Sequence, residues 1–217
     1  RLERGAGHAS HYPDEAYEQV TLVDDAAAAF GADLVLTVRA PSPERVTLLR
    51  EGAVLVGLLD PYREADTVHA LADRGVTSFA LELLPRITRA QTMDALTSQA
   101  SVAGYKAVLM AADLAPRYFP MLTTPAGTIR PAKVLVLGVG VAGLQAIATA
   151  RRRGALVEAY DVRQATKEQV QSLGGRFIDT GIDAEAEGGY ARELSDDEKA
   201  TAAAVVADHV AAADAVI

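Results

Sequence analysis

The clearest chemical signature in the sequence is a set of three glycines spaced as in a dinucleotide-binding fingerprint. Gly138, Gly140 and Gly143 stand between an apolar run and a helix-forming run. In such a turn the first glycine permits a tight bend, the second lets the backbone approach a pyrophosphate, and the third allows the helix to pack closely on the strand. The phosphates lie at the helix N-terminus, where free N–H groups and the helix dipole favour anions. The predicted pyrophosphate site comprises Gly138, Val139, Gly140, Val141, Ala142 and Gly143.

An acidic residue follows the glycines at the distance expected for contact with an adenine ribose. Asp161 ends the next predicted strand, roughly 20 residues beyond the fingerprint. A carboxylate there can accept hydrogen bonds from both ribose hydroxyls and would repel the 2′-phosphate of NADP. Val162 and Arg163 come next, and a nearby arginine can either serve a 2′-phosphate or simply open the next helix as a solvated residue. Because Asp161 outranks Arg163 in this pattern, we expect NAD(H) as the cofactor.

The elements around this motif occur in the order that dinucleotide binding requires. A strand is predicted at residues 134–137, followed by a helix that ends at Gly154, a second strand that leads to Asp161, and a third strand at 176–178. A lone glycine motif is often only a turn. The complete order of strand, fingerprint, helix, strand and acid favours a nucleotide site over a structural turn.

A second group of polar residues stands near the start of a long predicted helix. This group contains Arg86, Gln91, Asp94, Thr97 and Ser98. Thr88 and Gln91 fit a capping box, and Asp94 in the first turn suits the helix dipole, so sequence physics alone favours a purely structural role. The spacing nevertheless places a polar line beside the apolar side of the helix, so a ligand-facing edge is also possible.

Strand and helix patterns alternate along the first half as well. Strands are predicted at residues 34–38, 53–59 and 77–83, separated by helical segments. A long helix from residue 88 to about 113 is expected to bury one stripe of apolar side chains: Met93, Leu96, Ala100, Ala103 and Ala107. Residues 123–132 are expected to form a linker to the second strand and helix series.

These patterns predict an α/β fold with two doubly wound, Rossmann-like parallel-sheet domains joined by a long helix. The expected divisions are a first α/β domain at 1–88, a connecting helix at 89–115 and an NAD-binding domain at 116–217. The chain starts without a methionine and stops at what reads as the opening of a strand, so both domains are expected to be incomplete.

Composition excludes several classes of function. The 217 residues are 50% hydrophobic and carry a formal net charge of −8, which gives no basic surface for nucleic acid. The chain has no cysteine, and its longest apolar run, at 134–144, is far shorter than the roughly 20 residues of a membrane span. The histidines lie outside every motif and are expected to be surface or packing residues, so we expect no metal site: His8, His11, His69 and His209.

An acidic, glycine-containing segment at 179–199 is expected to be a long exposed loop. Composition alone leaves open whether it is a solvated excursion or a functional flap. Ser195 and Glu198 in this segment fit a capping box that starts the alanine-rich helix to Ala213.

Three segments resemble one known family over nearly the whole chain. PRITRAQTMDALTSQASVAGYKAV, FPMLTTPAGTIRPAKVLVLGVGVAGLQAIATARR and DVRQATKEQVQSLGG are similar to the NAD(H)-binding domain I, in the alpha subunit, of proton-translocating NAD(P) transhydrogenase. This resemblance implies that Arg86, Gln91 and Asp94 form a loop that positions the nicotinamide and its ribose. The family commonly has Ser where Thr97 stands.

The resemblance also implies roles for the remaining motifs and for partners outside the chain. The fingerprint with Asp161, Val162 and Arg163 would hold the pyrophosphate and adenosine ribose, and GGYAREL with Tyr190 resembles a mobile loop that closes over bound nucleotide. Further implications are a homodimer, a domain III that carries NADP(H), and a membrane domain II that couples Re/Si-specific hydride transfer to proton translocation. The expected location is the cytoplasmic face of the bacterial inner membrane.

Two alternatives remain at this point. Alanine dehydrogenase shares the architecture, but an amino-acid dehydrogenase must move a substrate proton and needs Lys and His at its cleft, where this chain has Arg39 and Asp60. A non-catalytic NAD-sensing module would keep the fingerprint and Asp161 but would have no use for the group at 86–94. Direct hydride transfer between nucleotides needs positioning and a water-poor contact rather than a general base, which agrees with the absence of an evident catalytic dyad.

Overall fold

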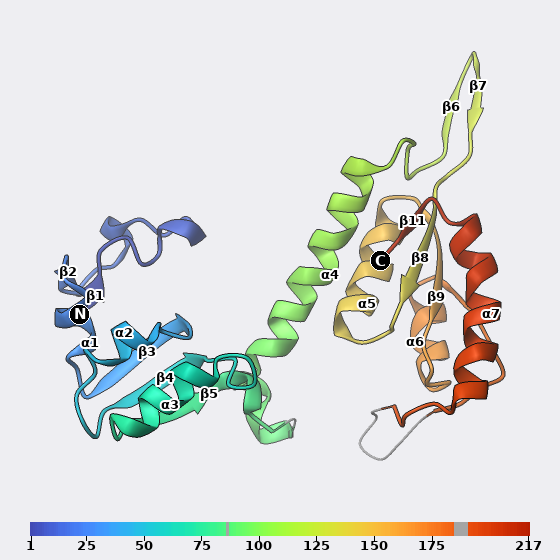
Figure 1. The fold of residues 1–217 in the computed structure, drawn as a ribbon. Helices are drawn as coiled ribbons and strands as arrows, with labels where there is room; N and C mark the ends of the chain where they lie inside the picture. Colours follow the sequence, from blue (N-terminus) through green and yellow to red (C-terminus); the bar gives the residue numbers. More distant parts are fainter. Residues whose placement is uncertain (86, 185–190) are drawn as a thin grey trace. The chain divides into compact units, whose positions relative to one another are not determined.

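The computed structural model describes residues 1–85, 87–184 and 191–217 (Figure 1). The chain forms two compact units, Arg1–Leu96 and Thr97–Ile217. Both units are built on parallel sheets, which confirms the predicted α/β fold.

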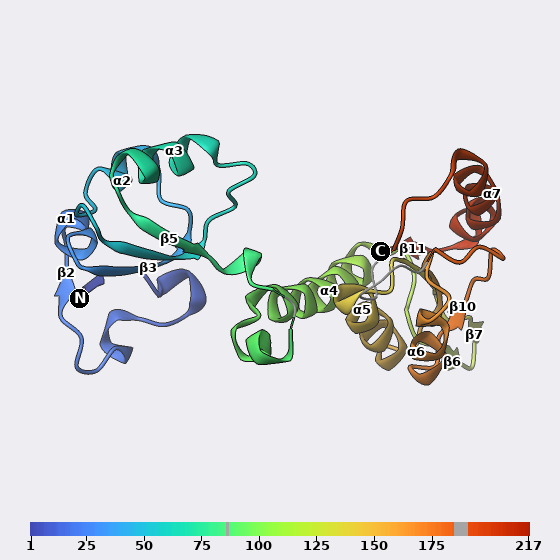
Figure 2. The ribbon, with the colours of Figure 1, turned by 90° about the horizontal axis from the view of Figure 1, so that it is seen from below.

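The first unit contains a three-stranded parallel sheet in the order β3-β4-β5. Its strands span Leu34–Arg39, Val54–Leu58 and Thr77–Ala80. The connecting helices α2 (Pro43–Val46) and α3 (Ala65–Asp73) lie on one face of the sheet (Figure 2). The apolar core between these layers consists of Phe30, Val35, Val46, Leu49, Leu55, Leu59 and Leu71.

Short elements complete the first unit. Strands β1 (Leu2–Glu3) and β2 (Leu22–Val23) pair in parallel, and α1 (Ala26–Phe30) follows, capped by the Asp25 carboxylate. The remaining short elements are the 3-10 helices His8–Ser10, Asp14–Ala16 and Leu81–Leu83.

The second unit contains a four-stranded parallel sheet in the order β10-β9-β8-β11. Its strands span Arg176–Phe177, Leu156–Tyr160, Lys133–Leu137 and Ala215–Val216. The chain forms β8, β9 and β10 in succession and then returns to place β11 on the other side of β8. This reversal creates a topological switch point between β8 and β11, and ligands of open α/β sheets bind at the carboxyl ends of the strands beside such a point.

Helices cover both faces of this sheet, as a doubly wound fold requires. Helices α5 (Val141–Arg152) and α6 (Thr166–Ser172) lie on one face, and α7 (Asp196–Ala212) lies on the other (Figure 2). Because both faces are covered, β8 is a nearly continuous apolar run, with Val134, Leu135 and Val136 each 1% exposed.

The long helix begins later than the sequence pattern predicts. Residues Thr88–Met93 form a 3-10 segment, and the α-helix α4 spans Ala95–Leu114. Between the two, Asp94 has a non-helical backbone, with φ −74° and ψ 87°. The predicted continuous helix from residue 88 is therefore wrong at its start, because the chain turns at Asp94.

The buried stripe predicted for this helix is also wrong. Gly104 and Val108 are the residues of α4 that are buried, whereas Met93 is 53% and Leu96 37% exposed. A Cβ on Gly104 would stand 2.0 Å from the carbonyl oxygen of Ala142, so α4 lies directly against the first turn of α5. Close approach at a small residue sets the rotation of the helix, and this signal is invisible to a count of large apolar side chains.

A β-hairpin replaces part of the predicted linker. Strands β6 (Leu122–Thr124) and β7 (Gly127–Ile129) pair antiparallel, and every residue in them is exposed. Within residues 1–85, 87–184 and 191–217, no helix has the length and apolar character that a membrane crossing requires.

Candidate nucleotide-binding site

The glycine loop after β8 has the geometry that its sequence predicts. Gly138 has φ +93°, a left-handed conformation that favours glycine, and its N–H donates to the Tyr160 carbonyl at 2.8 Å. A Cβ on Gly143 would lie 1.9 Å from the Gly138 carbonyl oxygen, so this position requires glycine for packing of α5 on β8. A Cβ on Gly140 would meet nothing within 4 Å. The loop therefore leaves open space beside Gly140, where a pyrophosphate could approach the backbone.

The N-terminus of α5 supplies the electrostatic part of the cradle. Gly140 precedes the helix with an extended backbone, and the N–H of Leu144 donates to the Gly140 carbonyl at 2.8 Å, which closes the first turn. The first N–H groups of an α-helix have no intrahelical acceptor and point along the axis with the positive end of the dipole. Because the N-cap is a glycine without a capping side chain, the helix end is accessible to an anion.

Asp161 lies at the end of β9 beside this loop and accepts a dense set of hydrogen bonds. Its carboxylate accepts from the Val139 N–H at 2.7 Å and from the Arg163 N–H at 2.9 Å. The Arg163 guanidinium adds two contacts, Nε to Oδ1 and Nη2 to Oδ2, both at 2.9 Å. The fingerprint loop and Asp161 are thus joined directly, since Val139 lies within the loop.

The charge state of Asp161 follows from these contacts. The residue is 8% exposed, and burial by itself raises the pKa of a carboxyl group. Hydrogen bonds from Arg163 and from the Val139 backbone outweigh this burial and hold the pKa of Asp161 below its usual value. The site therefore presents a buried carboxylate that is ionised at neutral pH.

The Arg163 guanidinium occupies the side of Asp161 that a ribose would need. It forms a bidentate ion pair with the carboxylate and also reaches the Val139 carbonyl at 3.4 Å. A diol that binds Asp161 must replace or share these contacts. The ambiguity that the sequence left at Arg163 thus has a structural form: the arginine is a partner of the carboxylate.

A cavity of about 530 Å³ opens at this edge of the sheet, which is within the range of small-ligand sites. The ends of β8 and β9 form one wall and α7 forms the other. Its lining residues are Leu137, Gly138, Tyr160, Asp161, Val162, Arg163, Ala191, Ala202, Ala203 and Val206. The alanines of α7 were not identified from the sequence, where they read as helix formers; their small side chains leave the space between helix and sheet.

The second predicted group lies partly around a smaller cavity in the first unit. This cavity has a volume of about 200 Å³, and Gln91 and Asp94 both line it. Thr97 and Ser98 stand in the first turn of α4 and are exposed. Arg86 and Tyr190 lie outside the described residues.

Among the histidines, His209 has a defined partner. Its Nδ1 lies 2.7 Å from the Glu158 carboxylate, which also pairs with Arg176. Burial raises the pKa of Glu158, but hydrogen bonds from His209 and Arg176 outweigh it and lower the pKa below the usual value. In the described part of the chain, no group of three or more His, Cys, Asp or Glu residues is arranged to hold a metal ion.

The strand order, the glycine loop at the switch point and the terminal carboxylate define the class of Rossmann-type dinucleotide-binding proteins. Comparison with known proteins narrows this class. Residues 1–103 match the family model "Alanine dehydrogenase/PNT, N-terminal domain", and residues 107–217 match "Alanine dehydrogenase/PNT, C-terminal domain". The chain belongs to the alanine dehydrogenase/PNT family.

Individual relatives carry transhydrogenase names. The chain is 49% identical over 208 residues to the first of the chains that make up the NAD(P) transhydrogenase alpha subunit of Rhodospirillum rubrum, covering 90% of this chain and 54% of the relative. It is 30% identical over 188 residues to the alanine dehydrogenase of Bacillus subtilis, covering 82% and 48%. A crystal structure of transhydrogenase from Sinorhizobium meliloti matches with a TM-score of 0.85 and 49% identity, over 99% of this chain and 58% of that one. The chain therefore spans about half the length of the relatives it matches.

Proposed function

We propose that this chain is the NAD(H)-binding component of an NAD(P) transhydrogenase, in which hydride passes directly between NAD(H) held here and NADP(H) held on a partner domain. The observation that carries the proposal is the complete dinucleotide cradle, with an open Gly140, a required Gly143 and a buried carboxylate at Asp161. The name of the Rhodospirillum rubrum relative, at 49% identity, supports this assignment over other NAD-dependent reactions.

The residues of this chain would contribute binding and orientation. Gly138 to Gly143 and the N-terminus of α5 would hold the pyrophosphate, and Asp161 with Val162 and Arg163 would hold the adenosine ribose. Gln91 and Asp94, with Arg86 from the same motif, would position the nicotinamide and its ribose; Thr97 and Ser98 would add hydroxyl groups nearby. Hydride transfer between two nicotinamides moves no substrate proton, so fixed geometry and exclusion of water supply the catalysis.

Partners complete the proposed activity. A domain III would present NADP(H), and a membrane domain II would couple hydride transfer to proton translocation, which would place this chain at the cytoplasmic face of the bacterial inner membrane. The Rhodospirillum rubrum relative is named as only one portion of an alpha subunit, which supports an assembly of several chains. All these partners lie outside the present chain.

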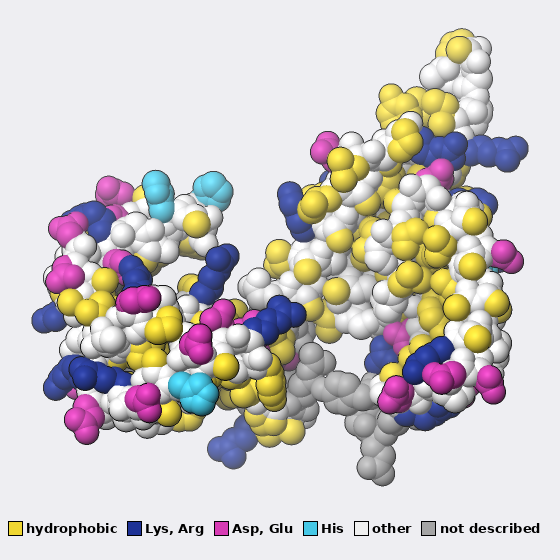
Figure 3. Space-filling model, viewed as in Figure 1, with side chains coloured by type: hydrophobic (Ala, Val, Ile, Leu, Met, Phe, Trp, Pro, Cys, Tyr) yellow, Lys and Arg dark blue, Asp and Glu magenta, His cyan; other side chains and the backbone are white. Residues whose placement is uncertain are grey.

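A homodimer is part of the same proposal. Apolar side chains are exposed along α4 and on the hairpin (Figure 3), where Met110 is 53%, Met121 64% and Ile129 42% exposed. An isolated two-stranded hairpin is marginally stable in water. A second copy of the chain would cover this surface, and sedimentation analysis of the purified protein would give the number of copies.

The alanine dehydrogenase alternative is supported by the 30% identical Bacillus subtilis relative. Arg39 ends β3 and Asp60 follows β4, and both are exposed at the carboxyl edge of the first sheet. Neither replaces a Lys and His pair that binds a carboxylate and moves an amine proton. The transhydrogenase assignment therefore requires fewer groups that this chain lacks.

A steady-state assay would test the proposal. The full-length protein that contains this chain would be mixed with an NADP(H)-binding domain III, with hydride transfer from NADPH to an NAD analogue as the readout and pyruvate plus ammonia with NADH as the comparison. We expect transfer between nucleotides and no turnover of pyruvate. In a Gln91→Asn variant, NADH binding should persist while transfer falls; unchanged transfer would remove the assigned role of Gln91. Pyruvate turnover would reinstate the dehydrogenase, and NADH binding without either reaction would favour a sensor.

A further inference from the structure

The two segments on either side of residues 185–190 are tied to the nucleotide cavity by backbone hydrogen bonds. The N–H of Ala184 donates to the Val162 carbonyl at 2.9 Å, and the N–H of Arg192 donates to the Ala184 carbonyl at 2.8 Å. Val162 lies between Asp161 and Arg163, and Ala191 lines the same cavity. Ala184 is fully buried, so this part of the segment is anchored rather than exposed as its composition predicts.

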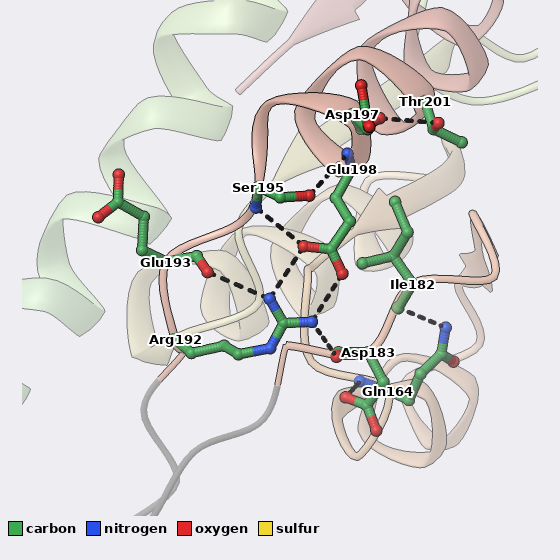
Figure 4. A network of polar contacts seen from close by, with 9 residues as sticks. All are labelled: Gln164, Ile182, Asp183, Arg192, Glu193, Ser195, Asp197, Glu198 and Thr201. Carbon is green, nitrogen blue, oxygen red and sulfur yellow. Dashed lines mark hydrogen bonds and ion pairs between the residues drawn. The ribbon is translucent and has the colours of Figure 1, made fainter.

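The Arg192 side chain reinforces this connection (Figure 4). Its guanidinium forms a bidentate pair with the Glu198 carboxylate, from Nη1 at 2.9 Å and from Nη2 at 2.7 Å. The same two nitrogens donate to the carbonyl oxygens of Glu193 and Asp183, each at 3.1 Å. One side chain therefore joins the segment before residue 185, the segment after residue 190 and the start of α7.

Glu198 is itself held in place by the helix that it caps. Its carboxylate accepts from the Ser195 N–H at 2.9 Å, and the Ser195 hydroxyl accepts from the Glu198 N–H at 3.3 Å, which confirms the predicted capping box. The hydrogen bond from Arg192, followed by that from the Ser195 backbone, lowers the pKa of Glu198 to about 2. The carboxylate is thus ionised and oriented before it meets the guanidinium.

We propose that Arg192 and Glu198 are positioning residues for nucleotide binding: their ion pair, here called the Arg192–Glu198 clasp, keeps the segments 182–184 and 191–195 together and holds Ala191 in the wall of the cavity beside Val162. This inference rests on the proposed NAD(H) site. The clasp acts on the cavity through the backbone of Ala184 and Ala191.

Solvent exposure determines where the effect of the clasp should be seen. The side chains of Arg192 and Glu198 are 43% and 30% exposed, and a single exposed ion pair contributes little to global stability. Bidentate geometry and shared carbonyl acceptors give the pair orientation rather than large energy. Its loss should therefore loosen the cavity wall locally and leave most of the unit folded.

The test uses the full-length protein with Arg192→Gln, Glu198→Gln and the double variant. A glutamine side chain can still complete the capping box, so Glu198→Gln removes the ion pair without removing the helix cap. Lys199→Gln is the matched control, because it removes the neighbouring surface pair between Lys199 and Glu193 on the same helix. The measurements are hydrogen exchange of the Ala184 and Arg192 amides, the Kd for NADH by fluorescence titration, and kcat at saturating NADH.

We expect each single variant to speed exchange of both amides and to raise the Kd for NADH by about tenfold, with kcat changed by less than about twofold and no further effect in the double variant. The control should match the wild-type protein. Unchanged exchange, unchanged Kd, or effects that multiply in the double variant would overturn the clasp. If the wild-type protein binds NADH but transfers no hydride, the proposed function fails while exchange and Kd still decide on the clasp.

Discussion

At the scale of single residues, the site depends on a few atoms whose positions are set by contact. Gly143 is required because a Cβ would overlap the Gly138 carbonyl, whereas Gly140 borders open space. Asp161 is ionised because hydrogen bonds from Arg163 and Val139 outweigh the burial that would otherwise raise its pKa. Packing and ligand access are therefore assigned to different glycines within one loop.

Two alanine substitutions should separate these roles. In Gly143→Ala, the Cβ would lie 1.9 Å from a backbone oxygen, so α5 must shift, and we expect a loss of stability of about 1–3 kcal/mol. In Gly140→Ala, the methyl group enters open space at a permitted φ of −83°, so the melting temperature should stay near that of the wild type while NADH affinity falls. Thermal unfolding and NADH titration of both variants check this. Equal loss of stability in the two variants would contradict the assignment.

Asp161→Asn should change cofactor preference. The amide oxygen can still accept from Val139, but the charge that pairs with Arg163 and repels a 2′-phosphate is gone. We expect NADH affinity to fall by roughly tenfold, since a hydrogen bond to a charged group contributes about 1.5–3 kcal/mol, and the preference over NADPH to shrink. Parallel titrations with NADH and NADPH measure both effects. An unchanged ratio of the two Kd values would remove Asp161 from the role of selecting NAD.

At the scale of elements, three helices position the site. The N-terminus of α5 faces the fingerprint loop, the N-terminus of α7 is held by the capping box and the Arg192–Glu198 clasp, and α4 lies against α5 through Gly104. Each position is determined by backbone groups or by short contacts, so each is sensitive to one added methyl group or one lost charge.

Gly104→Ala tests the position of α4. The new Cβ would lie 2.0 Å from the Ala142 carbonyl oxygen within the fingerprint helix, so the two helices must separate. We expect a loss of stability of about 1–3 kcal/mol from this overpacking, measured by denaturant unfolding. Ala103→Ser on the exposed side of the same helix is the control and should be neutral. A neutral Gly104→Ala would show that the contact between the helices is not tight.

The pH dependence of α7 follows from Glu198. Its pKa is lowered from 4.5 to about 2 in the folded chain, so its contribution to stability is complete above about pH 4.5 and disappears as the pH falls towards 2. We expect the melting temperature of the wild type to exceed that of Glu198→Gln at pH 6, and the difference to shrink steadily between about pH 4.5 and pH 3. A difference that is constant over this range would show that the carboxylate has the same pKa in the folded and unfolded chain.

Much of the second unit could be predicted from sequence because its signals are local. The strand, the glycine loop, the helix and Asp161 follow one another within a short stretch, and the capping box at Ser195 depends on adjacent residues. The ion pair between Asp161 and Arg163 could not be predicted, because it depends on which of two roles the arginine side chain takes. The clasp could not be predicted for the same reason, since its acceptors lie on both sides of residues 185–190.

The errors share a different cause. The hairpin at Leu122–Ile129 reads as a linker because its short strands have no buried face, and α4 was assigned the wrong stripe because large apolar residues were counted while Gly104 was not. In both cases the deciding contact lies outside the local pattern. Hydrophobic periodicity identifies a helix more reliably than it identifies the face that packs.

At the scale of the whole molecule, the chain comprises two compact α/β units and spans about half the length of the relatives it matches. The cradle for one dinucleotide lies within the second unit, and Gln91 and Asp94 line a separate cavity in the first. Direct transfer between two nucleotides requires a second nucleotide from a partner, which agrees with a chain whose residues supply binding and orientation rather than acid and base groups.

The most direct test of this account follows the hydrogen itself. NADPH carrying deuterium at the transferred position of the nicotinamide would be incubated with an NAD analogue, the full-length protein and domain III, and the reduced analogue examined by mass spectrometry. The account predicts that the deuterium appears in the reduced analogue without dilution by solvent hydrogen, and that Gly140→Ala slows this transfer. Loss of the label to water, or its appearance in an amino acid when pyruvate and ammonia are present, would contradict direct hydride transfer between nucleotides.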